Sequence, residues 1–230
     1  MLGFIPSEFV QHQGEGELKT IFLSDAELVP AEIPDNTLFL AKQNATISDF
    51  TTLFTIFDES FLGDNFSVVI FALGKNDISF PEKRLVFNEK TQTLDFHPVQ
   101  KSNNNFAFQI YNSLIEVLCE FGNVSKVLSM SPMSRQSSGF HNRCVFHVDR
   151  KTTKVDEKHA HLSICGRYQR NLSRNRPKPA IYFPLVEDRF DENGVLRGEE
   201  KQMLASAALM ALESTESAIV VGDAHFKKKF

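Results

Sequence analysis

The run of apolar residues within 66–73 constrains the fold more than any other feature of the sequence. Its letters, FSVVIFAL, are mostly β-branched or aromatic, which is typical of a strand. Because the apolar residues do not alternate with polar ones, we expect a central strand that is buried on both faces. A chain of 230 residues can enclose such a strand in a large core without disulfides or metal ions.

Further short strands are expected in the first hundred residues. They are rich in β-branched or aromatic residues and are bounded by turn-forming residues. These segments are 37–41, 51–57, 84–88 and 93–97, the last two forming a hairpin. Residues 1–100 are therefore predicted to form an acidic, β-rich part of the chain.

The periodicity of apolar residues becomes helical after residue 103. We expect one helix over about 103–121 and a second, rich in Ala, Met and Leu, over about 199–214. Further strands are expected at 124–130, 143–150, 158–165, 180–186 and 217–222. Because no regular β-α-β rhythm is visible, the predicted class is α+β, with antiparallel-rich mixed sheets and two main helices. Residues 101–230 form a second, α+β part, or the whole chain forms one continuous domain.

Charge is distributed unevenly along the chain, although the net charge is only −4. Residues 1–100 carry 15 acidic and 6 basic side chains, whereas residues 134–178 carry 11 basic and 3 acidic ones. Such asymmetry informs about partners and not about the fold. A polyanion would fit the basic region, and so would an acidic protein surface, including the acidic part of a second copy.

A predicted hairpin within the basic region gathers several polar side chains. Side chains alternate between the two faces of a strand, so strands at 143–150 and 158–165 would have one apolar and one polar face. The polar face carries His147, Asp149, His159 and His161. This face is interpreted in three ways: as an exposed structural surface, as a nucleic-acid-binding surface, or as a catalytic or metal site.

The nucleic-acid interpretation depends on arginine. Guanidinium groups make bidentate contacts with phosphates and stack on bases. RNA or single-stranded DNA is favoured over duplex DNA, because the basic residues lie on strands and on an arginine-rich loop at 166–179 instead of a recognition helix. The predicted nucleic-acid-binding residues are Arg135, Arg143, Arg150, Arg167, Tyr168, Arg170, Arg174, Arg176 and Lys178.

The catalytic interpretation depends on histidine. His147, His159 and His161 are the predicted catalytic residues, because paired imidazoles can act as general base and general acid on a phosphodiester. Together with Asp149 they are candidate ligands of a divalent metal, which is the one cofactor considered.

Two short motifs carry resemblances to known families. His159-Ala-His161 resembles the His-x-His motif of nucleases that nick single-stranded DNA through a tyrosine and a metal. His161-Leu-Ser163 resembles one half of the His-x-Ser/Thr pair of two-histidine phosphoesterases. Each resemblance covers fewer than ten residues, and neither assigns the chain to a family.

The sequence thus leads to one main hypothesis and two alternatives. The main hypothesis is a nucleic-acid-binding protein that uses the basic strand face and loop at 134–178. The alternatives are a structural or assembly protein, docking on an acidic partner or forming a homo-oligomer, and a His- or metal-dependent phosphodiesterase. Three irregularly spaced Cys residues, no secretion signal and no long apolar run favour a cytoplasmic protein without membrane contact.

Overall fold

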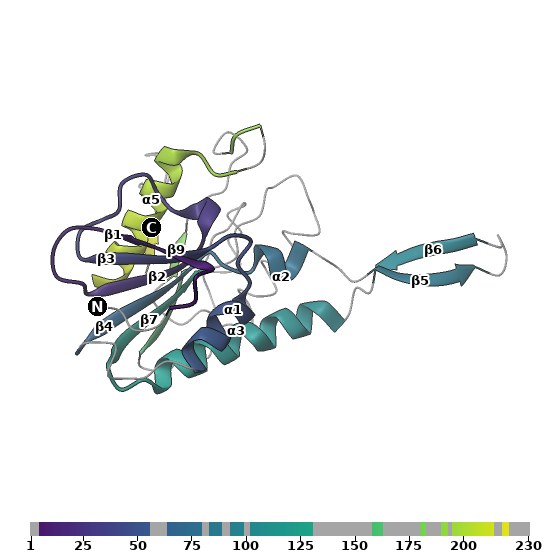
Figure 1. Cartoon of the computed structure of the whole chain (residues 1–230), viewed down its shortest axis with the longest axis horizontal. Helices are drawn as coiled ribbons and strands as arrows, with labels where there is room; N and C mark the ends of the chain where they lie inside the picture. Colours follow the sequence, from purple (N-terminus) through teal and green to yellow (C-terminus); the bar gives the residue numbers. More distant parts are fainter. Residues whose placement is uncertain are drawn as a thin grey trace.

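A six-stranded, mostly parallel sheet forms the centre of the molecule (Figure 1). The computed structural model describes residues 5–55, 64–79, 83–88, 93–98, 102–130, 158–162, 180–182, 190–192, 195–213 and 218–220. The strands of the sheet, in spatial order, are β1 (Phe9–Gln13), β3 (Thr37–Lys42), β2 (Thr20–Asp25), β4 (Phe66–Phe71), β7 (Val124–Met130) and β8 (His159–Leu162). Only β1, at one edge, pairs antiparallel.

The order of the five parallel strands defines the fold class. Counted along the chain, their spatial order is second, first, third, fourth and fifth, which is a doubly wound α/β arrangement. The chain therefore passes from β2 to β3 on one side of β2, and then from β3 to β4 on the other side. The strand order reverses between β2 and β4. The predicted antiparallel-rich α+β fold is wrong, because the main sheet is parallel.

Two local features hide the β-α-β rhythm in the sequence. The predicted strand 51–57 lies largely in helix α1 (Ile47–Thr55), whose buried residues Ile47, Phe50, Leu53 and Phe54 recur at helical spacing. The connection from β2 to β3 contains only one turn of 3₁₀ helix, η1 (Ala26–Leu28). The sequence prediction also lacks β2 itself.

Both predicted main helices are present, as α3 (Ser102–Glu120) and α5 (Gly198–Glu213). The predicted hairpin is present as β5 (Lys83–Asn88) and β6 (Thr93–Pro98), which stand apart from the main sheet (Figure 1). The remaining elements are the short helix α2 (Lys75–Ser79) and a parallel pair of short strands, β9 (Ala180–Tyr182) and β10 (Ala218–Val220).

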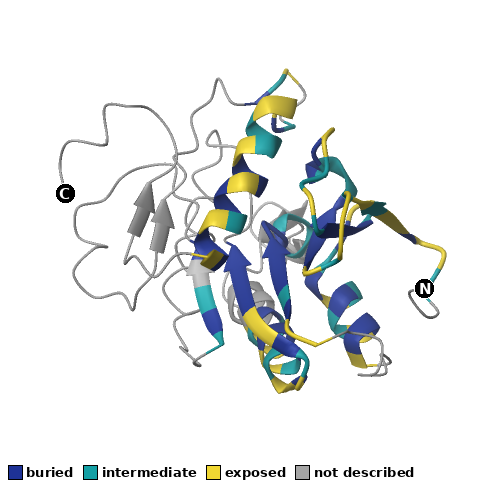
Figure 2. Ribbon diagram, turned by 90° about the vertical axis from the view of Figure 1, so that its left-hand side faces the viewer, coloured by how far each residue is buried: buried dark blue, intermediate teal, exposed yellow. Residues whose placement is uncertain are grey.

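Helices cover both faces of the sheet. α1 and α3 pack on one face, whereas η1 and α5 pack on the other, and the strands between them are buried (Figure 2). On the α5 face, Phe22, Phe39 and Phe71 are each 0% exposed. Their rings stack at 4.4 Å (Phe22–Phe39) and meet edge to face at 5.4 and 5.5 Å. Among the described residues, no helix is both long and apolar enough to cross a membrane.

Truncation of the central ring of this cluster should strongly destabilise the fold. We expect Phe22→Ala to lower the free energy of unfolding by about 3–5 kcal/mol, because it removes a buried ring and leaves a cavity. Val10→Ala, on the edge strand, is the control, since Val10 is 51% exposed. Urea unfolding measures both changes, and equal, small losses would contradict the described core.

Candidate functional site at the carboxyl edge of the sheet

Polar residues follow three neighbouring parallel strands where those strands end. Asp25 ends β2, Lys42 ends β3, and Gly74-Lys75-Asn76-Asp77 follows β4. The carboxyl ends of parallel strands meet at one edge of the sheet. In doubly wound folds, ligands bind at this edge where the strand order reverses, here between β2 and β4.

Asn76 connects the loops that follow β2, β3 and β4. Its side-chain Nδ2 donates to Asp25 Oδ2 at 2.8 Å and to the carbonyl oxygen of Ala45 at 2.9 Å. The next residue, Asp77, accepts a hydrogen bond from the backbone N–H of Ile47, the first residue of α1, at 3.1 Å. The segment after β4 therefore fixes the positions of the other two loops.

Asp25 is a buried carboxyl group at this edge. The residue is 6% exposed, and its Oδ1 accepts the backbone N–H of Glu27 at 3.1 Å, which caps η1. Burial raises the pKa of Asp25 above its usual value, although the hydrogen bonds from Glu27 and Asn76 act in the opposite direction. A carboxyl group with a raised pKa in a ligand-binding region is a candidate for proton transfer.

An ion pair lines the same recess as this carboxyl group. Lys75 Nζ pairs with Glu27 Oε1, and both side chains are partly exposed. The recess leaves no space for a water molecule. Its lining residues are Asp25, Glu27, Leu28, Ala45, Ala72, Leu73, Gly74, Lys75 and Asn76.

The backbone around the recess contains unusual conformations. Ala72, directly after β4, has φ of 50°, and Gly74 has φ of 111°. The left-handed region is unfavourable for Ala but open to Gly. Strained backbone of this kind occurs preferentially at functional sites, which supports a functional role for the loop after β4.

The sequence-predicted residue His159 lies in a different, buried place. It begins β8, is 6% exposed, and its Nε2 lies 2.7 Å from Ser129 Oγ on β7. Nearby, the hydroxyl of the buried Tyr111 on α3 donates to the carbonyl oxygen of Met130. His159 is therefore part of a buried polar contact and does not lie on an exposed strand face.

The other site residues predicted from the sequence lie mostly outside the part of the chain that the structure describes. For His161 the structure gives only its place in β8, opposite Ser129. His147, Asp149, the predicted strand 143–150 and all nine predicted nucleic-acid-binding residues lie outside the described residues. Their grouping into one site stays a prediction. Within the described part of the chain, no group of three or more His, Cys, Asp or Glu side chains could hold a metal ion.

Comparison with known proteins gives a distant structural likeness. Neither a protein-family model nor a curated protein matches the chain. The acetylxylan esterase Axe2 from Geobacillus stearothermophilus is similar in structure, with 11% identity, a TM-score of 0.49, and coverage of 89% of this chain and 97% of that chain. A catalytic mutant and a second mutant of that esterase each give 12% identity and a TM-score of 0.48 at the same coverage. At this level the likeness carries no argument about chemistry.

The nucleic-acid-binding hypothesis is wrong. It placed His159 on an open polar strand face within 134–178, whereas β8 pairs in parallel with β7 and His159 is buried. The phosphodiesterase alternative used the same strand face and is not retained. The predicted acidic or homo-oligomeric partner depends on the basic region at 134–178, most of which lies outside the described residues, so nothing in the structure tests it.

Asp25, Glu27, Lys75 and Asn76 are not among the site residues predicted from the sequence. A signal for them exists, because the polar run at 74–77 directly follows the apolar segment that was predicted to be a central strand. Recognition of 20–25 as a second parallel strand would have placed Asp25 beside this run.

Removal of the Asn76 side chain should destabilise the loops at the carboxyl edge of the sheet. We expect Asn76→Ala to lower the free energy of unfolding by about 1–3 kcal/mol, because it deletes two hydrogen bonds to partly buried acceptors. Gln11→Ala, an exposed amide on β1, should change stability very little. Thermal or urea unfolding compares the two variants, and equal effects would show that the Asn76 bridge does not stabilise the fold.

The raised pKa of Asp25 should also appear in the pH dependence of stability. Between the unfolded and the higher folded pKa, the folded state binds more protons, so this contribution to stability is lost as pH rises. We expect the free energy of unfolding of the native protein, relative to that of Asp25→Asn, to fall as the pH rises from acid toward neutral values. Urea unfolding across this range measures it, and a rising difference would give the opposite sign to the shift.

Proposed function

We propose that the chain binds a small polar molecule at the carboxyl edge between β2 and β4, and that Asp25 exchanges a proton with it. The observation that carries this proposal is a buried carboxyl group of raised pKa at the reversal of strand order. Both the position and the titration behaviour are those expected of a ligand-contacting acid or base.

The hydrogen bonds around Asp25 suit this role. One carboxylate oxygen accepts from the Glu27 backbone and the other from Asn76, so the group is held in one orientation. A raised pKa brings the carboxyl group closer to neutral pH, which improves it as a general acid or base.

Ligand entry requires the Lys75–Glu27 pair to separate. A partly exposed ion pair contributes only about 0–1 kcal/mol, so a ligand can displace it at small cost. After separation, the ammonium of Lys75 becomes available to a negatively charged or strongly polar group of the ligand.

The chemistry proposed is proton transfer and not covalent catalysis. The described residues that line the recess supply two carboxyl groups, one ammonium and one amide, and they include no Ser, Thr, Cys or His. We therefore assign no serine nucleophile to this recess.

Ligand binding can be tested by ¹H–¹⁵N spectra of the labelled protein with a set of small acids, amides, sugars, nucleosides and acetyl esters. We expect at least one compound to shift the amides of 25–28 and 72–76 saturably, and Asp25→Asn to weaken that binding by about tenfold or more. Glu17→Gln, which changes an exposed carboxyl group elsewhere, should bind normally. Shifts confined to other parts of the chain, or equal binding by Asp25→Asn, would contradict the proposal.

A further inference from the structure

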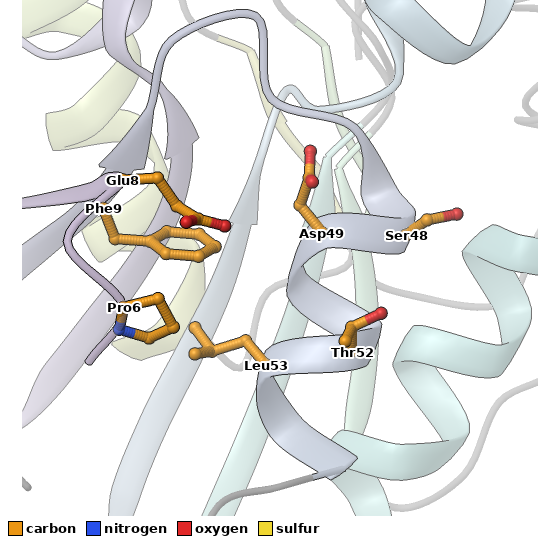
Figure 3. A pocket seen from close by; sticks show the side chains of 7 residues that line it. All are labelled: Pro6, Glu8, Phe9, Ser48, Asp49, Thr52 and Leu53. Carbon is orange, nitrogen blue, oxygen red and sulfur yellow. The ribbon is translucent and has the colours of Figure 1, made fainter. Parts of the chain in front are cut away.

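A cavity of about 190 Å³ lies between the beginning of β1 and helix α1 (Figure 3). Its apolar side consists of Pro6, Phe9 and Leu53, and the Leu53 side chain points toward the Phe9 ring. The remaining lining residues are Glu8, Ser48, Asp49 and Thr52. The cavity shares no lining residue with the recess at Asp25, so it is a separate candidate site.

The charged groups beside the cavity are unequally matched. Lys42 Nζ lies 2.7 Å from Asp49 Oδ1 but 3.6 Å from Glu8 Oε1, so one ammonium serves two carboxylates. The net charge of this group is therefore negative, and Glu8 is the more weakly paired carboxylate.

Asp49 is held firmly in its charged form. Its Oδ2 accepts the backbone N–H and the hydroxyl of Thr46, at 2.7 and 2.8 Å. Burial alone would raise the pKa of Asp49, but the hydrogen bonds from Lys42 and Thr46 outweigh it and lower the pKa. The carboxylate that remains available to a ligand is consequently that of Glu8, whose side chain is 57% exposed.

The Phe9 ring beside the cavity already accommodates one positive charge, that of Lys42. Lys42 Nζ lies 5.6 Å from the centroid of the Phe9 ring, within the range of cation–π attraction. An anion would be repelled by the net negative charge of Glu8, Asp49 and Lys42 and by the electron-rich face of the Phe9 ring. Figure 3 also shows the hydroxyls of Ser48 and Thr52 pointing away from the apolar side, so they provide no competing polar contact there.

We propose that this cavity binds a small organic cation, with its ammonium group at Glu8 and its apolar body against Pro6, Phe9 and Leu53. The size is appropriate, because an apolar cavity of about 150 Å³ is known to accept a benzene ring. This site goes beyond the proposed function, since neither Asp25 nor Asn76 takes part in it.

Titration of the full chain with benzylammonium tests the site, and benzyl alcohol serves as the neutral probe of the same shape. We expect benzylammonium to shift the backbone amides of 8–9 and 48–53 and to bind about tenfold more tightly than benzyl alcohol. In Glu8→Gln the two probes should bind equally. Glu17→Gln, the matched control on an exposed loop, should keep the full preference for the cation.

Three results would overturn the proposal. They are equal affinities for the two probes in the native protein, shifts that fall outside 6–9 and 48–53, and no saturable shift with benzylammonium. Because Glu8 is largely exposed, its replacement leaves the fold intact, and the comparison of probes in the native protein needs no variant. Asp25→Asn should not affect benzylammonium binding, which separates this site from the one at Asp25.

Discussion

The two hydrogen bonds donated by Asn76 hold together the part of the molecule on which its proposed chemistry depends. A doubly wound sheet brings the ends of β2, β3 and β4 to one edge, but it does not by itself fix the loops that follow them. Nδ2 of Asn76 reaches the Asp25 carboxylate on one side and the Ala45 carbonyl on the other. The site therefore acts as one unit made from three separate segments of the chain.

The pKa values of three carboxyl groups at this edge are shifted in two directions, and the difference follows from their hydrogen-bond donors. Burial raises the pKa of Asp25 and of Asp77, whose donors are neutral backbone or amide N–H groups. Asp49 has the Lys42 ammonium as a partner in addition to two donors from Thr46, and its pKa is lowered. One edge of the sheet thus offers a carboxyl group of raised pKa at the end of β2 and one of lowered pKa in the segment after β3, which suits two different kinds of ligand.

The sequence allowed prediction of strongly periodic elements but not of their connections. The apolar segment at 66–73, the helices α3 and α5 and the hairpin β5–β6 all have clear local patterns. α1 was misassigned because Thr51, Thr52 and Thr55 favour a strand locally, whereas burial of Ile47, Phe50 and Phe54 selects the helix. The composition of the sequence does not reveal the site at Asp25, because its amide and carboxyl groups come from segments that are distant along the chain. The sequence prediction used the high density of basic residues instead, and it therefore placed the site in residues 134–178.

The pKa of the Asp25 carboxyl group tests the central claim most directly. Its side-chain ¹³C resonance can be followed by NMR during a pH titration of the intact protein, and Asp25→Asn identifies the signal by its loss. The account predicts a pKa above the ordinary value of an aspartate, with a further rise when Asn76 is replaced by Ala. An Asp25 pKa at or below the ordinary value would show a solvated or fully ion-paired carboxylate and would contradict the proposed role in proton transfer.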